Sequence, residues 1–219
     1  MRRALFALLL ACAAASAAAQ DPAVAPSEAE RLLFLQEHLA NVSRPRVLRF
    51  RYEEDAPGKA RVSDAAVFTL RMREGGPCCD VHGEYLSGAM AVNLPDFTAA
   101  RANPVVLYFL EGEVRRLERS TGGQAAHFRR QLRIALAETA AVSDSSIQWD
   151  AQARPARTVR VVPFARDPFR ARFADQADIE YAFVLSDAVP GGVYQMSATL
   201  PGAGAPRARR TLTLEEDKR

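Results

Sequence analysis

Side chains capable of metal binding or nucleophilic chemistry gather in one short stretch of the chain. Cys78 and Cys79 are adjacent, His82 follows closely, and Asp80 and Glu84 flank the histidine. Thiolate and imidazole groups are ligands that zinc and copper prefer, and a thiol beside an imidazole can act as a nucleophile. One hypothesis is therefore an enzyme or a metal-binding protein that uses Cys78, Cys79 and His82.

The spacing of the two cysteines favours a plainer interpretation. Structural zinc sites usually separate paired cysteines by two or more residues, and the chain offers no second pair. A disulfide between neighbours is also unfavourable, because Cα atoms across a trans peptide lie about 3.8 Å apart and ordinary disulfides span roughly 4.4–6.8 Å. We therefore expect a surface turn in which Cys78 and Cys79 are free or form mixed disulfides, with no metal and no cofactor.

Other patterns typical of catalysis are missing from the sequence. Neither Ser87 nor Ser120 lies in a Gly-x-Ser-x-Gly turn, and the glycine-rich phosphate-binding patterns do not occur. His38 and His127 fall near the end of one expected helix and the start of another, where histidines usually face solvent or contact a helix terminus. The chain is thus interpreted as a non-catalytic binding module, with an enzyme kept as the alternative.

The amino-terminal segment is organised like a secretory signal peptide. A basic pair precedes an apolar run over residues 4–15, and small residues stand at Ala17 and Ala19. We expect cleavage after Ala19, which would place the mature chain in the periplasm or outside the cell. No later segment is long and apolar enough to span a bilayer, so we expect no transmembrane segment in the mature chain.

Cys12 permits a second interpretation of the same segment. The residues Leu-Leu-Ala-Cys that end at Cys12 are similar to the lipobox of bacterial lipoproteins, in which the cysteine is lipidated. The apolar run before Cys12 is short for such a signal, which favours cleavage at Ala19. A lipid anchor at Cys12 stays open as the alternative.

Composition and charge limit the class of protein. The chain has 219 residues, of which 48% are hydrophobic and 25% charged, as expected of one globular domain. We expect a signal peptide over 1–19, a flexible leader rich in Pro and Ala over 20–27, and a single α+β domain over 28–219. The formal charge of +3 includes Arg2 and Arg3 of the expected signal peptide, so the mature chain would be close to neutral. Its overall charge therefore argues against a nucleic-acid partner.

A stretch rich in arginine, residues 151–173, has six arginines against the single acidic residue Asp167. Such a cluster suits anionic lipid or an acidic partner. A solvated face is the preferred interpretation, because strand positions flanking the core are often charged and Asp167, Asp175 and Asp178 are near enough to pair with the later arginines.

The sequence predicts three main helices. Ser27 and Glu30 have the spacing of a capping box, which predicts a helix over about 28–40. Asn103-Pro104 begins a second helix over 104–119, although the apolar run 105–110 also suits a short buried strand. A third helix is expected over about 124–139, and the SDSS sequence that follows is expected to break the chain.

Period-two alternation predicts antiparallel strands on both sides of the central helices. The expected strands cover residues 47–52, 68–72, 147–149, 158–164, 179–185, 193–200 and 210–214, with weaker ones over 81–86 and 89–94. Hairpin turns are expected at 190–192 and 201–204, and a short helix carrying Phe169 and Phe173 after Asp167-Pro168.

This order of elements predicts an α+β fold. The expected architecture is a curved, open-barrel-like antiparallel sheet with the N-terminal helix and the two central helices packed on one face. Aromatic residues near strand ends would either line a pocket for an apolar ligand, such as a lipid, or pack in the core; they are Tyr52, Tyr181, Phe183 and Tyr194. The partner is therefore expected to be an apolar ligand or an envelope protein.

Two blocks of sequence carry a resemblance. NPVVLYFLEGEVRRLERSTGG at 103–123 and FVLSDAVPGGVYQM at 183–196 resemble a family of exported bacterial proteins that is known only as hypothetical proteins. The resemblance covers most of the mature chain and implies export but no activity. The order of elements also looks like that of periplasmic lipoprotein carriers, open antiparallel barrels with helices on the concave side, and this likeness transfers no ligand-binding residue.

Overall fold

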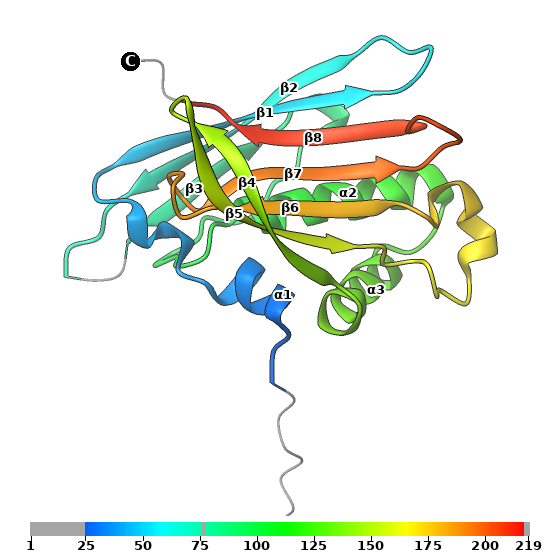
Figure 1. Cartoon of the computed structure of the whole chain (residues 1–219), viewed down its shortest axis with the longest axis horizontal. Helices are drawn as coiled ribbons and strands as arrows, with labels where there is room; N and C mark the ends of the chain where they lie inside the picture. The colour runs from blue at the N-terminus through cyan, green and yellow to red at the C-terminus, as the bar shows by residue number, and fades with distance from the viewer. Residues whose placement is uncertain (1–24, 76–77, 217–219) are drawn as a thin grey trace, which may run out of the picture.

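The computed structural model describes residues 25–75 and 78–216 (Figure 1). The predicted signal peptide, leader residues 20–24 and Cys12 lie outside the described residues. Within the described part of the chain, no helix has the length and apolar character needed to cross a membrane.

Eight strands form one curved, open antiparallel sheet, as the alternation predicted (Figure 1). The strands are β1 (Arg46–Asp55), β2 (Val62–Arg71), β3 (Asp80–Tyr85), β4 (Ala141–Trp149), β5 (Gln152–Val161), β6 (Glu180–Leu185), β7 (Val193–Leu200) and β8 (Ala208–Leu214). Their order is β3-β2-β1-β8-β7-β6-β5-β4, so the amino-terminal and carboxy-terminal strands meet at the β1–β8 pair.

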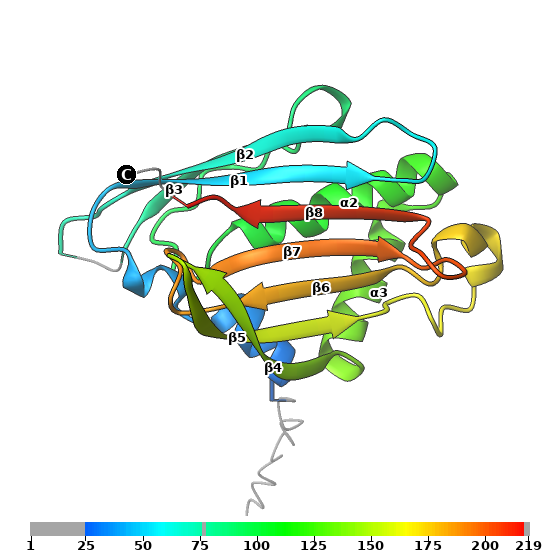
Figure 2. The same ribbon diagram turned by 45° about the horizontal axis from the view of Figure 1, so that its top comes forward.

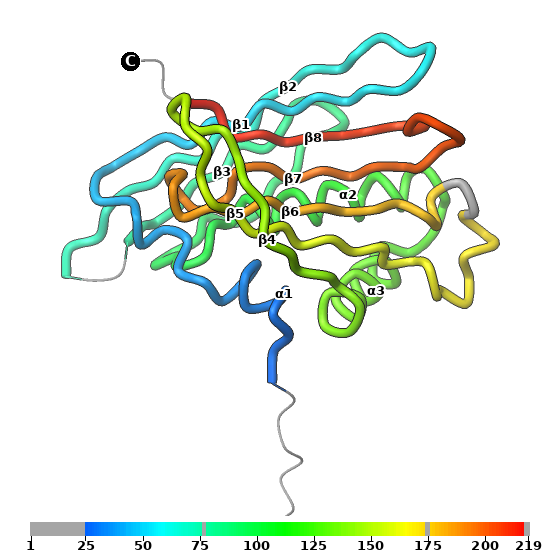
Figure 3. Tube along the Cα trace, viewed as in Figure 1, coloured from blue at the N-terminus to red at the C-terminus, as the bar shows by residue number. Residues whose placement is uncertain are grey.

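The two central helices connect opposite edges of this sheet. β3 and β4 follow each other along the chain but lie at the two edges, so the intervening residues 86–140 must cross one face. They do so with α2 (Val105–Thr121) and α3 (Ala125–Glu138), which lie together on that face (Figures 2 and 3). Both helices and the α+β class agree with the sequence prediction, and the apolar run 105–110 is helical rather than a strand.

The core fills the space between α2 and the inward face of the sheet. The ring of Phe68 meets those of Phe50 and Tyr108 edge-on, with centroids 5.9 and 5.2 Å apart. Farther along the sheet, Phe109 contacts Tyr181 and Phe183 in the same way. These rings are fully buried, and their burial holds α2 against strands from both halves of the sheet.

The first helical segment is shorter than predicted. The Ser27–Glu30 capping box is present and starts α1 (Glu28–Glu30), which continues into a π-helical turn, η1 (Arg31–Leu35). The chain then becomes extended at Gln36 and resumes as a 3₁₀ turn, η2 (His38–Asn41). His38 and Leu39 follow this break in the helix, and both are buried. The expected helix over 28–40 would have placed them near its end.

Two further expectations about local structure are wrong. Residues 89–94 form a 3₁₀ turn, η3 (Gly88–Met90), and a single bridge between Val92 and Tyr85 instead of a strand. The SDSS sequence does not break the chain but lies inside β4. β4 is an edge strand, where polar side chains remain in water, and the Ser145 and Thr158 hydroxyls are 2.8 Å apart across the β4–β5 pair.

The expected turns and the short helix after Asp167 are present. Residues 186–192 join β6 to β7 and residues 201–207 join β7 to β8. The short helix is the 3₁₀ segment η4 (Arg170–Gln176), in which Phe173 is buried, while Phe169 just before it is half-exposed.

Candidate functional site

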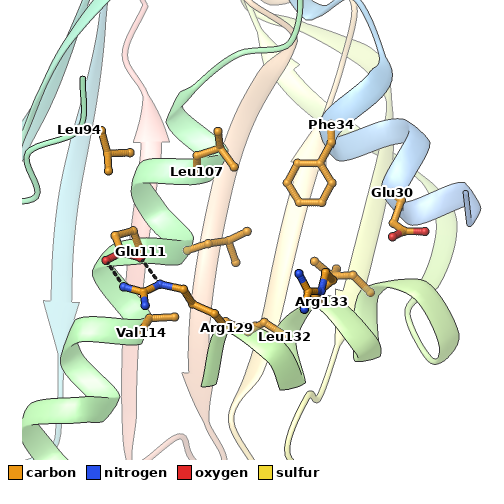
Figure 4. A pocket seen from close by; sticks show the side chains of 11 residues that line it. Glu30, Phe34, Leu94, Leu107, Glu111, Val114, Arg129, Leu132 and Arg133 are labelled. Atoms are coloured by element: carbon orange, nitrogen blue, oxygen red, sulfur yellow. Dashed lines mark hydrogen bonds and ion pairs between the residues drawn. The ribbon is translucent and has the colours of Figure 1, made fainter. Parts of the chain in front are cut away.

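An apolar groove of about 430 Å³ opens among the helices (Figure 4). Every lining residue belongs to a helical segment or to the connection between β3 and α2. We call it the helix groove; it is lined by Glu30, Phe34, Leu94, Leu107, Leu110, Glu111, Val114, Arg129, Leu132, Arg133 and Leu136. Seven of these residues are apolar; Val114, Leu132 and Leu136 are at most 4% exposed, whereas Leu107 is 42% exposed.

α2 and α3 supply most of the lining of the groove. On α2, Leu107, Leu110 and Val114 recur at the spacing of one helical side, together with Glu111. Leu132 and Leu136 lie one turn apart on α3. Leu107 is 42% exposed.

The third wall comes from the amino-terminal segment. The Ser27 hydroxyl donates to the Leu136 carbonyl over 2.9 Å, which ties the start of α1 to the end of α3. The Ser27 amide in turn donates to Glu30 over 2.9 Å. This connection holds Phe34, on the next turn, over the groove (Figure 4).

Charged side chains form the rim of the groove. Both oxygens of Glu111 accept from Arg129, over 2.9 and 2.7 Å, and Arg115 donates to the same carboxylate over 3.1 Å. The hydrogen bond from Arg129, with a further contribution from Arg115, lowers the pKa of Glu111, and Glu111 raises the pKa of Arg129. Arg133 lies one turn beyond Arg129 and forms no ion pair with any residue in 25–75 or 78–216.

No protein-family model and no curated protein matches this sequence.

Cys78 and Cys79 are joined by a disulfide, which corrects the expectation of unlinked thiols. That expectation assumed a trans peptide, whereas the peptide bond between the two residues is cis. Cys79 is buried in the core, and the preceding residue, Cys78, is half-buried beside the Val42 carbonyl.

His82 does not join the cysteines in one site. It is exposed on β3, at a position that alternates with the buried Val81, and its Nδ1 atom lies 2.7 Å from an oxygen of Asp96. Within the described part of the chain, no three His, Cys, Asp or Glu side chains are grouped so as to hold a metal ion.

The other two histidines are more deeply placed than expected. His38 is 2% exposed, with Nε2 2.8 Å from the Leu32 carbonyl oxygen and Nδ1 3.1 Å from the Asn103 amide nitrogen. His127 is partly buried, and its Nε2 atom lies 2.6 Å from Asp167. The sequence placed both near helix ends, facing solvent or contacting a helix terminus, and did not indicate the contacts of His38 with Asn103 and of His127 with Asp167.

The arginine-rich stretch behaves largely as a solvated face. Arg157 pairs with Glu28 and Asp144, and Arg160 pairs with Glu180, all at exposed or half-exposed positions. Among the later arginines, Arg170 pairs with Asp178 as expected. Asp167 contacts His127 instead of an arginine.

Of the two interpretations of the strand-end aromatic residues, core packing is confirmed for three of the four. Tyr52, Tyr181 and Phe183 are core residues with at most 2% exposure. Tyr194 is half-buried and its ring meets Trp149 edge-on on the sheet. The apolar cavity lies among the helices because the inward face of the sheet is already filled by α2.

A buried ion pair was also missed by sequence reasoning. Arg210 on β8 donates to both oxygens of Glu113 on α2, over 2.9 and 2.5 Å, and both residues are at most 4% exposed. A signal was present: Arg210 is in phase with the inward Leu212 and Leu214, and Glu113 lies on the sheet-facing side of α2.

Proposed function

We propose that this chain is an exported envelope domain that binds an apolar ligand in the helix groove and does not catalyse a reaction on it. The observation that supports this proposal is a mainly hydrocarbon-lined hollow left open on the folded surface, with Leu107 42% exposed in it. Contact with water is unfavourable for such a surface, and an apolar ligand would remove it. The groove volume of about 430 Å³ falls in the range of small-molecule sites, roughly 300–1,000 Å³.

A small ligand suits the groove better than a protein partner. Stable protein interfaces involve about 20–30 residues on each side. The groove is lined by 11 residues and is hollowed rather than flat.

The enzyme or metal-protein alternative finds less support. Cys78 and Cys79 are linked to each other, and His82 is directed to a different side of β3 from the buried Cys79. Export itself rests on the signal-like sequence over residues 1–19 and on the resemblance to exported bacterial proteins. An apolar carrier or sensor in the envelope is consistent with both.

The test is displacement of the neutral fluorescent probe N-phenyl-1-naphthylamine by straight-chain alkanols of increasing length. If the groove binds hydrocarbon, affinity should rise about fourfold for each added methylene until the groove is full, because each buried methylene contributes about 0.8 kcal/mol. The mature chain, residues 20–219, is the protein to use.

A pair of matched variants localises the binding. Leu107→Gln places a polar group in the groove and should weaken alkanol binding by about fivefold or more. Val62→Gln is the control, because Val62 is exposed to a similar degree, 39%, at the start of β2. Affinity without chain-length dependence, or an equal loss in both variants, would overturn the proposal.

A further inference from the structure

We propose that the ligand of the helix groove is a single-chain amphiphile with a carboxylate head group, and that Arg133 binds this head group. This inference rests on the proposed function and adds the chemical class of the ligand. It follows from how the charges at the rim of the groove are paired, because Arg129 has a carboxylate partner and Arg133 has none among the described residues.

Of the two arginines that line the groove, Arg129 pairs with a carboxylate and Arg133 does not pair with one among the described residues. Arg129 and Arg133 are four residues apart on α3, so their side chains are neighbours on one side of the helix. Glu111 directs both of its oxygens to Arg129 (Figure 4). It also accepts from Arg115. Glu111 is thus fully engaged, and Arg133 is left beside a like charge without an acidic partner in the described residues.

The other carboxylate of the groove is engaged elsewhere. Glu30 accepts from the Ser27 amide and completes the capping box of α1. Glu30 and Arg133 both line the groove but do not form an ion pair with each other. An anion entering the groove would therefore find Arg133 available.

The apolar lining lies beside this arginine. Leu132 precedes Arg133 in sequence and Leu136 follows one turn later, and both line the groove with Leu110 of α2. A ligand with a hydrocarbon chain would bury the chain against these leucines and bring its head to the rim. The bond that Arg129 makes to Glu111 shows how a guanidinium on this side of α3 holds a carboxylate.

The experiment compares three probes of equal chain length below their micelle-forming concentrations: dodecanoate, dodecan-1-ol and dodecyltrimethylammonium. Each displaces N-phenyl-1-naphthylamine from the mature chain at low ionic strength. We expect dodecanoate to bind about three- to tenfold more tightly than dodecan-1-ol, the cationic probe to bind most weakly, and the preference to shrink as salt is added.

Arg133→Gln is the decisive variant, and Arg130→Gln is its matched control. Arg130 is the exposed arginine three residues earlier on α3 and does not line the groove, so both variants lose the same net charge. Arg133→Gln should abolish the preference for dodecanoate and leave the affinity for dodecan-1-ol unchanged. Arg130→Gln should retain the preference.

The outcomes separate this inference from the proposed function. Equal affinities for dodecanoate and dodecan-1-ol, or a preference that survives in Arg133→Gln, would overturn the inference and leave a neutral-ligand groove. No binding of any of the three probes would overturn both. Probe binding that falls as protein concentration rises would show a second copy of the chain in the groove, which would also overturn the inference.

Discussion

The buried pair of Glu113 and Arg210 shows how two charges can connect a helix to a sheet. Burial alone would lower the pKa of Arg210, but the adjacent Glu113 carboxylate outweighs it and raises that pKa. Nearby, Arg116 of α2 donates to the Tyr52 hydroxyl over 3.0 Å and to Glu54, so the polar network extends from α2 to β1. The pair costs desolvation on both sides and is stable only when both members are present.

Glu113→Ala should therefore lower the free energy of unfolding by about 3–5 kcal/mol, because it leaves the Arg210 guanidinium buried without a carboxylate. The double variant Glu113→Leu with Arg210→Met should lose less than half as much, since it leaves no charge behind. Urea denaturation of both proteins measures the difference. A double variant as unstable as the single one would contradict the explanation.

His38 is a buried base held in one neutral form. The Leu32 carbonyl can only accept, so Nε2 carries the hydrogen, and the Asn103 amide can only donate, so Nδ1 must accept. Burial lowers the pKa of His38 below its ordinary value of 6.5, against smaller raising effects of the Leu32 carbonyl and the Asp187 carboxylate. A second proton would sit on Nδ1 and face the Asn103 amide hydrogen.

Because the folded pKa is the lower one, the unfolded chain takes up this proton first as the pH falls below about 6.5. The contribution of His38 to stability is thus complete above that pH and is lost towards acid. His38→Gln, which can still donate and accept, should lose less stability than the wild type between pH 7 and 5, by up to about 1.4 kcal/mol per pH unit. Urea denaturation across that range tests this, and parallel pH profiles would contradict it.

At the scale of elements, α2 is the helix on which the fold depends, because it is apolar on two sides. One side packs against the sheet through Phe109 and Tyr108, and the other lines the helix groove through Leu110. The close approach of α2 to β3 is made possible by Gly83. Its carbonyl accepts from the Tyr108 hydroxyl over 3.2 Å, and a Cβ there would lie 2.8 Å from the rings of Phe68 and Tyr108.

Gly83→Ala should therefore lower the free energy of unfolding by about 1–3 kcal/mol, because the aromatic rings on both sides leave no room for a methyl group. Phe68→Leu removes one of the two contacts, so the double variant should lose less than the sum of the two single losses. Thermal or urea unfolding of the four proteins gives the coupling. Strictly additive losses would show that the close approach is not the cause.

At the scale of the whole molecule, the last strand completes the first. β8 lies between β1 and β7, and Leu212 is opposite both Tyr52 and Met196. β8 therefore connects the β1–β3 half of the sheet to the β4–β7 half, through a pairing of strands that are far apart in sequence.

Deleting residues 206–219 should abolish cooperative unfolding, because it exposes the inward edges of both β1 and β7 at once. Near-ultraviolet circular dichroism and urea denaturation measure the loss. Adding a peptide of residues 206–216 is the control and should restore part of the signal. A truncated chain that keeps a sharp transition would show that the two halves fold independently.

Elements that depend on residues close together in the chain could be predicted from the amino-acid sequence alone. Alternation at residues 47–52 and 193–200 predicted β1 and β7, the Ser27–Glu30 spacing predicted the capping box, and helical spacing predicted α2 and α3. In each case the residues that indicate the element lie within it, so the spacing of apolar and capping residues along the sequence is sufficient. The α+β class followed from the order of these elements.

Contacts between residues far apart in the chain could not be predicted from the sequence, because they depend on how the elements pack. Glu113 and Arg210 are 97 residues apart, and His38 and Asn103 are 65 apart, so no periodicity relates them. The helix groove likewise depends on how three helical segments lie on the sheet, because a helix with two apolar sides does not indicate which side stays open. Long-range packing assigns those sides, since it determines which apolar surface the sheet covers and which remains for a ligand.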